Sequence, residues 1–239
     1  MCGRISMEAM LKDIVRELGV DSKQARELQS NYNIKPTEDL YVITKDEINV
    51  ASWGMIAPWS KSNSEALKSQ SKAINARSET VHEKPTFRKA FRRSRCLVPA
   101  TGYYEWATEL GDYKPRQPIY ISRDDGKIMA FAGIHDRWIS PEGESRDSVS
   151  IITREAVGNL AKFHSRMPMF LPRERWSKWL DPDLQDVDTI RNLFEDFQPD
   201  ANLQFWPVAA KSIQFETMVP NLLPQLPLFL RRFFSHKSE

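Results

Sequence analysis

The second residue of the chain, Cys2, gains unusual chemistry from its position. It follows the initiator Met1 and is small, so we expect Met1 to be removed. Cys2 would then carry a thiol and a free α-amine, whose reference pKa values are about 8.5 and about 7.7–8.0. Such a terminus condenses with an aldehyde to an imine, and the thiol then closes a five-membered thiazolidine ring. The alternative is a loose terminal residue without a role, since termini are often poorly ordered.

The composition is that of an ordinary globular protein. The 239 residues are 41% apolar and carry 34 basic and 32 acidic side chains, which leaves enough apolar material for a sizeable core. Two cysteines, Cys2 and Cys96, exclude a disulfide-rich secreted scaffold. The two cysteines and the scattered histidines lack the spacing of zinc ligands, so we predict no metal and no other cofactor.

No apolar segment of a secretory signal follows Met1. The longest apolar run, residues 222–230, is broken by two prolines and is too short to cross a membrane. We therefore expect a cytoplasmic protein without a membrane segment, associated with the nucleoid if the cell is bacterial.

The net charge of +2 conceals a local imbalance. Residues 84–95 carry six basic and no acidic side chains, whereas residues 181–200 carry seven acidic side chains and one arginine. The basic segment could face phosphates. The alternative is a solvated, exposed helix face, because such runs are only hints of nucleic-acid binding.

Several sequence blocks resemble the SOS response-associated peptidase (SRAP) family of abasic-site processing proteins, in the same order along the chain. They are MCGR at 1–4, YNIKPT at 32–37, WGMIAPW at 53–59, INARSET at 74–80, Phe87-Arg88, CLVPATGYYEW at 96–106, FAGI at 131–134 and HSRMP at 164–168. The resemblance runs from residue 2 to about residue 209. It implies a DNA-repair protein that recognises abasic sites in single-stranded DNA and forms a thiazolidine crosslink with them through Cys2. It also implies autocatalytic removal of Met1 and an associated lyase activity.

The matching blocks nominate three partners for Cys2. The amide of Asn75 both donates and accepts hydrogen bonds, which suits holding the terminal amine and thiol; a turn or capping asparagine is the alternative. Glu105 follows an apolar run, and burial would raise its pKa and suit it to proton transfer; a solvent-facing strand glutamate is the alternative. His164 could donate a proton or a hydrogen bond to the sugar oxygen that leaves as the ring opens, or it could be structural.

The resemblance also nominates DNA contacts. Arginine matches phosphate oxygens geometrically, and the alternative for each arginine is an ordinary surface position or a carboxylate partner. The predicted DNA-binding residues are Arg4, Pro36, Arg77, Arg88, Thr153 and Arg166.

The elements that must position these residues are short. Hydrophobic spacing predicts helices over 7–18, 87–93, 154–163, 172–180 and 184–197, and strands over 40–44, 48–53, 96–100, 103–106, 118–122, 128–134, 149–153 and 205–209. Residues 124–126, Asp-Asp-Gly, predict a hairpin between the strands over 118–122 and 128–134. Residues 61–72 and 140–148 are polar and read as loops.

This order predicts an α+β fold: one SRAP-like domain over 2–220, with a mostly antiparallel, β-barrel-like core and flanking helices, and a C-terminal apolar and basic tail over 221–239. We expect a monomer whose partners are abasic single-stranded DNA and replication-fork proteins. Two other functions stay open. Cys2 could act with His164 in a cysteine peptidase that cleaves other proteins, or the protein could bind single-stranded or modified DNA without catalysis.

Overall fold

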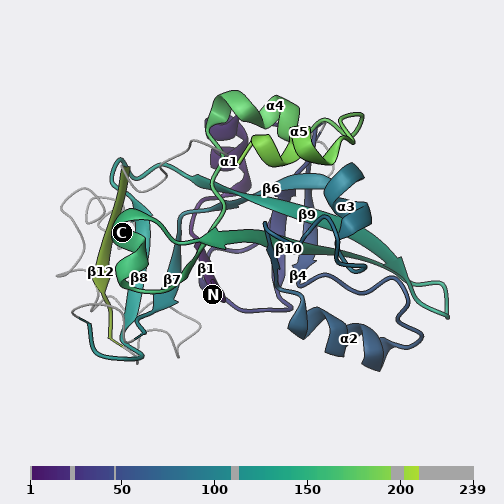
Figure 1. The fold of residues 1–239 in the computed structure, drawn as a ribbon, viewed down its shortest axis with the longest axis horizontal. Coiled ribbons are helices and arrows are strands. Elements are labelled where there is room, and N and C mark those ends of the chain that lie inside the picture. The colour runs from purple at the N-terminus through teal and green to yellow at the C-terminus, as the bar shows by residue number, and fades with distance from the viewer. Residues whose placement is uncertain (1, 22–24, 46, 109–112, 195–201, 210–239) are drawn as a thin grey trace, which may run out of the picture.

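The computed structural model describes residues 2–21, 25–45, 47–108, 113–194 and 202–209. The strands are β1 (Arg4–Met7), β2 (Asn31–Ile34), β3 (Asp39–Ile43), β4 (Ile48–Trp53), β5 (Asn75–Arg77), β6 (Arg95–Ala100), β7 (Gly102–Trp106), β8 (Pro118–Arg123), β9 (Met129–Ile139), β10 (Ser145–Glu155), β11 (Arg166–Pro168) and β12 (Leu203–Pro207). The helices are α1 (Leu11–Leu18), α2 (Asn63–Lys72), α3 (Arg88–Arg93), α4 (Trp176–Trp179) and α5 (Val187–Asn192), with 3₁₀ helices η1 (Gly158–Lys162) and η2 (Arg173–Arg175). Figure 1 shows their arrangement.

Five strands close into a barrel. They follow the order β10-β4-β3-β6-β9, and β9 pairs back onto β10 to complete the ring. Every pairing in this ring is antiparallel except that of β10 with β4. Beyond the ring, β10 also pairs with β5 on one side and β11 on the other. The predicted α+β class with a mostly antiparallel, barrel-like core is therefore confirmed.

A second sheet extends from the barrel, in the order β12-β8-β7-β1-β2. Only Thr101 separates β6 of the barrel from β7 of this sheet, and its N–H donates to the Ser6 carbonyl at 2.9 Å. β1 pairs antiparallel with β7, with Arg4 opposite Tyr104. The sheet thus brings the start of the chain alongside the end of β7.

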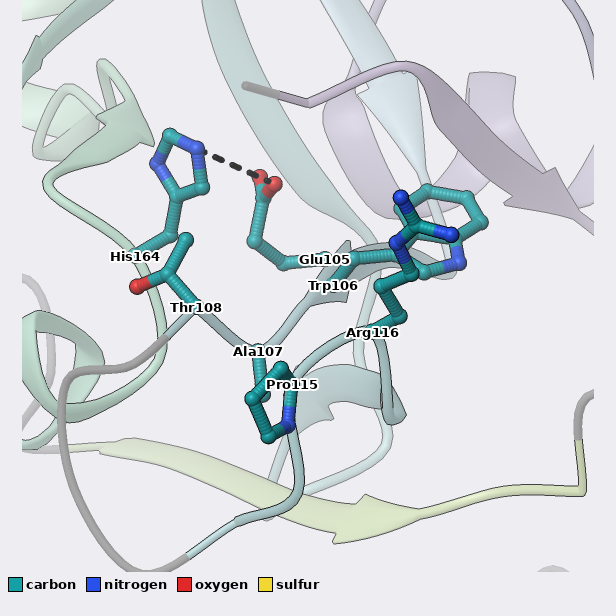
Figure 2. Close-up of a pocket in the computed structure, with 7 residues that line it drawn as sticks. All are labelled: Glu105, Trp106, Ala107, Thr108, Pro115, Arg116 and His164. Atoms are coloured by element: carbon teal, nitrogen blue, oxygen red, sulfur yellow. Dashed lines mark ion pairs between the residues drawn. The ribbon is translucent and has the colours of Figure 1, made fainter.

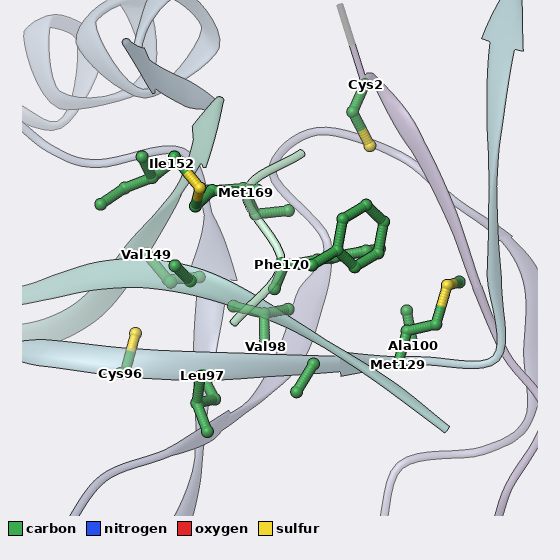
Figure 3. Close-up of a cluster of buried hydrophobic side chains, with 14 of the residues drawn as sticks. Cys2, Cys96, Leu97, Val98, Ala100, Met129, Val149, Ile152, Met169 and Phe170 are labelled. Carbon is green, nitrogen blue, oxygen red and sulfur yellow. The ribbon is translucent and has the colours of Figure 1, made fainter. Parts of the chain in front are cut away.

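The apolar core joins the two sheets. Side chains alternate along β7, so Tyr103 and Glu105 are buried while Tyr104 and Trp106 lie on the opposite face and are partly covered. Figure 3 shows part of this core, with Cys2 and Cys96 at separate places in one cluster of buried side chains. A carboxylate on β7 therefore faces the same interior as Cys2.

The polar segment over 61–72 was predicted as a loop, which is wrong. Residues Asn63–Lys72 form helix α2, and the Ser62 side chain accepts a hydrogen bond from the N–H of Glu65 at 3.2 Å. Only Ala66 and Gln70 on this helix are buried. The N-cap at Ser62 stabilises the start of the helix. Because the buried face is narrow, the apolar periodicity is too weak to recognise.

The hairpin predicted at Asp124-Asp125-Gly126 is also wrong. The turn forms, with Gly126 at φ 71°, but β8 pairs with β7 and β12 whereas β9 pairs with β6 and β10. Each flanking strand finds its partners in a different sheet. A turn sequence specifies a local reversal, and tertiary packing decided which strands then pair.

Several boundaries moved as well. β10 is longer than predicted and takes residues 145–148 from the predicted loop and 154–155 from the predicted helix, which is reduced to η1. The first helix starts at Leu11, because β1 uses Met7 for pairing. Its predicted end is correct, since Gly19 adopts φ 66° and donates to the Val15 carbonyl. The helix predicted over 184–197 is observed over Val187–Asn192, and residues 195–197 lie outside the described residues.

The other predicted strands and the helix near Arg88 form at or close to their expected positions. The helix predicted over 172–180 is divided between η2 and α4. The predicted tail over 221–239 lies outside the described residues. Within the part of the chain that is described, no helix has the length and apolarity needed to span a membrane.

Candidate active site

Cys2 lies two residues before the start of β1 and is fully buried. Burial, reinforced by the nearby charge of Glu105, raises the pKa of its thiol well above the ordinary range. The thiol is therefore held in its protonated form. The other cysteine, Cys96, is buried inside the barrel, and its thiol pKa is raised by burial alone, as expected for an inert structural thiol.

Asn75 binds the backbone at Cys2. Its Nδ2 donates to the Cys2 carbonyl at 2.8 Å, across 73 residues of sequence. β5 places Asn75 there by pairing in parallel with β10, where Asn75 lies opposite Ile151. The Asn75 Oδ1 is buried and has no hydrogen-bond partner among the described residues. The side chain of Asn75 thus donates to the Cys2 backbone and keeps a buried acceptor next to it.

Glu105 and His164 face each other. Glu105 is 3% exposed, and burial raises its pKa. His164 Nε2 lies 3.9 Å from Glu105 Oε1. The His164 Nδ1 accepts a hydrogen bond from the Arg166 N–H at 2.9 Å, which requires the neutral ring to carry its proton on Nε2. Burial also lowers the pKa of His164, so the ring is neutral near pH 7 and directs an N–H toward the carboxyl group.

The four predicted catalytic residues therefore converge, and we call Cys2, Asn75, Glu105 and His164 the reactive cluster. They come from the N-terminus, β5, β7 and the segment before β11. A buried carboxylic acid lies 3.9 Å from an imidazole, and an amide contacts the backbone of Cys2. This set can support nucleophilic addition with proton transfer.

Arg166 joins two of these segments. Its guanidinium forms a bidentate ion pair with Glu79 at 2.7 and 2.9 Å and donates to the Thr153 carbonyl at 2.7 Å. Glu79 follows Asn75 by four residues, and Arg166 follows His164 by two. The ion pair therefore links the segment that carries Asn75 to the segment that carries His164.

We expect Glu79→Gln to reduce the free energy of unfolding by about 1 kcal/mol, because it removes the charge from a bidentate pair whose arginine is 15% exposed. The matched control is Asp147→Asn, which disrupts the exposed bidentate pair with Arg137 and should change stability by less than about 0.5 kcal/mol. The Arg166 hydrogen bonds lower the pKa of Glu79. The stabilisation is therefore present above the ordinary value of 4.5 and is lost as the pH falls through the lowered one. Urea unfolding at pH 7 and at pH 3 measures both effects. Equal losses of unfolding free energy in the two variants would show that the Arg166–Glu79 pair contributes no more than an exposed ion pair.

The predicted DNA-binding residues lie in different environments. Arg4 donates to the Asn33 side chain at 2.8 Å, while Arg77 and Arg88 are exposed. Pro36 is half-buried, and Thr153 is fully buried.

The basic segment over 84–95 is mostly exposed, which agrees both with a surface that faces phosphates and with a solvated helix face. Arg88, Lys89, Arg92 and Arg93 are exposed on α3. Arg95 is 4% exposed, and backbone carbonyls of the segments before β6 and around α4, including that of Trp179 at 2.6 Å, accept its hydrogen bonds. Arg95, one of the six basic side chains, is therefore buried in the fold and does not contribute to the exposed basic surface.

A pocket of about 380 Å³ opens beside the reactive cluster (Figure 2). Its lining combines the acid and the imidazole with residues from the end of β7 and the turn before β8: Glu105, Trp106, Ala107, Thr108, Pro115, Arg116 and His164. The sequence interpretation missed Thr108, Pro115 and Arg116. The available signal was Pro115, a proline in a turn three residues before β8 begins at Pro118.

The family model for the SOS response associated peptidase (SRAP) matches residues 1–213. The chain belongs to the SRAP family. Among curated relatives, it is 34% identical over 205 residues to abasic site processing protein YoqW of Bacillus subtilis, covering 84% of this chain and 89% of that protein. It is 32% identical over 206 residues to abasic site processing protein HMCES of Rattus norvegicus, covering 75% of this chain and 57% of that protein.

The SRAP fold is also present among solved structures. A crystal structure of a protein from Bacteroides thetaiotaomicron is 29% identical to this SRAP chain, with a TM-score of 0.80, and covers 92% of this chain and 98% of that one. The resemblance inferred from the sequence blocks is thereby confirmed.

Proposed function

We propose that this protein processes abasic sites in single-stranded DNA by forming a covalent thiazolidine crosslink through Cys2. The observation that carries the proposal is the convergence of Asn75, Glu105 and His164 on a cysteine that follows the initiator methionine. The names of the SRAP relatives supply the substrate class, since YoqW and HMCES are both abasic site processing proteins.

The first step is exposure of the amine. Hydrolysis of the Met1–Cys2 peptide bond consumes one water and releases free methionine together with the α-amine of Cys2. We propose that this step is autocatalytic, and the word peptidase in the family description agrees with cleavage of a peptide bond. The hydrogen bond from Asn75 to the Cys2 carbonyl would hold the new terminus in place.

The second step is condensation with the sugar. An abasic deoxyribose opens to an aldehyde, and His164 would donate its Nε2 proton or a hydrogen bond to the sugar oxygen as the ring opens. The α-amine adds to the aldehyde carbon, and the carbinolamine loses water to give an imine. Glu105 would accept a proton during addition and return one to the departing hydroxyl. Burial raises the pKa of Glu105, which suits both roles, because the ionised carboxylate then accepts a proton more readily and holds it for return to the leaving group.

The third step closes the ring. The thiol sulfur adds to the imine carbon, the carbon–nitrogen double bond becomes a single bond, and the thiol proton is transferred to nitrogen. The aldehyde and the aminothiol thus lose one water in total.

The imine before ring closure also acidifies the neighbouring sugar carbon. Removal of a proton from that carbon by Glu105 would eliminate the 3′ phosphate and cleave the strand, as a lyase does.

The peptidase alternative receives less support from the geometry. A cysteine peptidase acting on other proteins needs a thiolate at neutral pH, whereas burial and the charge of Glu105 raise the pKa of the Cys2 thiol. The imidazole of His164 faces Glu105 with its Nε2 proton and uses Nδ1 as an acceptor. This arrangement fits proton exchange with a carboxyl group rather than deprotonation of a thiol.

The proposal is tested by intact mass and a denaturing gel. Purified protein should lack the mass of one methionine, and mixing it with a single-stranded oligonucleotide containing one abasic site should give a band at the summed mass. Protein with an uncleaved extension before Cys2 is the control and should give no band. Equal binding of abasic and undamaged strands without any covalent product would instead support a non-catalytic DNA binder.

Glu105→Gln should slow adduct formation while stabilising the fold. Burial raises the pKa of Glu105, so its ionised form is disfavoured in the folded state, and stability is lost as the pH rises through that raised value. We expect the melting temperature of the variant at pH 8 to exceed that of the parent by about 2–4 °C, the shift that ~1 kcal/mol produces in a domain of this size. The difference should disappear near pH 4. A variant that melts below the parent at pH 8 would show that the ionised carboxylate is stabilising.

A further inference from the structure

The pocket beside the reactive cluster extends beyond the groups that the proposed chemistry uses. Glu105 and His164 line one part of it, and Trp106, Pro115 and Arg116 line another (Figure 2). The proposed reaction consumes only a sugar aldehyde, whereas an abasic site in DNA also carries a phosphate on each side. The remainder of the pocket is therefore where a flanking group of the strand would lie.

Arg116 is the arginine that lines this pocket. Within the described residues, the structure gives its exposed guanidinium no hydrogen bond and no ion pair. By contrast, Arg166 is held by Glu79, and Arg95 is surrounded by carbonyls. A guanidinium carries a permanent charge and matches phosphate oxygens in a bidentate manner.

The backbone at Arg116 is strained. Residues Lys114–Gln117 form a turn closed by the Gln117 N–H and the Lys114 carbonyl at 2.9 Å, with Pro115 second and Arg116 third at φ 67°. A turn with proline second and positive φ third favours glycine or asparagine at the third position. Arginine in this conformation costs roughly 1–2 kcal/mol.

The turn is also fixed to the end of β7. The Arg116 N–H donates to the Ala107 carbonyl at 2.8 Å, and the Ala107 N–H donates to the Gln117 carbonyl at 2.9 Å. These two bonds position Arg116 relative to Glu105, two residues before Ala107. Strain that surrounding structure maintains is often found at binding sites.

We propose that Arg116 binds a phosphate oxygen of the nucleotide next to the abasic sugar when that sugar occupies the reactive cluster. This inference rests on the proposed function for the identity of the sugar. The strained arginine is then explained, because the turn directs a permanent cation into the pocket where a glycine would give an easier backbone and no ligand for the strand.

The test uses Arg116→Gly and a non-reactive ligand. The ligand is a single-stranded oligonucleotide with one tetrahydrofuran abasic analogue, which keeps both phosphates and has no aldehyde. Binding should weaken about tenfold or more, as expected for loss of a charge-assisted hydrogen bond worth ~1.5–3 kcal/mol, and the salt dependence of log K should fall by about 0.7. The melting temperature should stay equal or rise, because glycine relieves the positive φ.

Arg16→Ala is the matched control, since it removes one positive charge from α1, where Arg16 is 76% exposed and paired with Asp13, outside the pocket. It should leave binding within about twofold and the salt slope unchanged. Unchanged binding in Arg116→Gly, or an equal loss in Arg16→Ala, would overturn the proposal. Because the analogue cannot crosslink, this result is independent of the adduct assay with wild-type protein, whose failure would count against the proposed function alone.

Discussion

Replacing Cys2 with alanine is expected to abolish the crosslink to abasic DNA completely. The variant keeps an α-amine after removal of Met1, so it can still form an imine, but it has no sulfur to close the ring. An imine hydrolyses readily and does not survive a denaturing gel. The measurement is the yield of the shifted band after incubation with an abasic oligonucleotide, with binding measured separately to show that the DNA still associates.

Two further variants make this result specific. Cys2→Ser should also give no stable adduct, and it should retain some strand cleavage because the imine that allows elimination still forms. Cys96→Ala is the matched control, since Cys96 is the other fully buried thiol and lies in β6 of the barrel. It should crosslink as the parent does. A stable adduct in Cys2→Ala, or its loss in Cys96→Ala alone, would exclude the thiazolidine mechanism.

Gly54→Ala is expected to cause the largest loss of stability among single methyl additions in the barrel. Gly54 follows β4 with φ 113°, and a Cβ there would lie 2.3 Å from the Gln70 backbone oxygen at the end of α2. The Gly54 N–H is also bonded to the Val149 carbonyl at 2.7 Å, so the chain cannot move away without breaking that bond. We expect a loss of about 3 kcal/mol or more from overpacking and backbone strain together.

Gly143→Ala separates the two causes. Gly143 also has positive φ, at 89°, but a Cβ there would meet nothing within 4 Å. This variant should lose only about 1 kcal/mol, the backbone contribution. The two melting temperatures should therefore differ by about 4–8 °C, and equal melting temperatures would show that α2 moves aside at little cost.

Disturbing the close contact between Gly54 and α2 should also change the position of Asn75 in the reactive cluster. The Met55 N–H donates to the Ala73 carbonyl, and the Trp53 indole donates to the Ile74 carbonyl at 3.0 Å, immediately before Asn75. A shift of α2 would move this segment. Crosslinking measured well below the melting temperature should therefore slow in Gly54→Ala and stay unchanged in Gly143→Ala.

The sequence blocks nominated the members of the reactive cluster because these residues lie in blocks that resemble the SRAP family. An early cysteine has an obvious chemical consequence, and a glutamate at the end of an apolar strand predicts a buried carboxyl group. Most strands were also recognisable; β6 and β8, for example, each contain an apolar run, over 96–100 and 118–121. Helix α2 was missed, since only two of its residues are buried.

What the sequence determined by itself is a set of residue types and a fold class: a cysteine at position 2, an amide, a carboxylic acid and an imidazole in family blocks, within a mostly antiparallel α+β domain. The tertiary structure decided which strands pair and which of these side chains lie next to one another. Local patterns cannot report that β9 returns to β10 and closes the barrel, that β8 and β9 separate after their turn, or that Asn75 donates to the carbonyl of Cys2. These outcomes depend on contacts between distant segments, whose energies no short stretch of sequence contains.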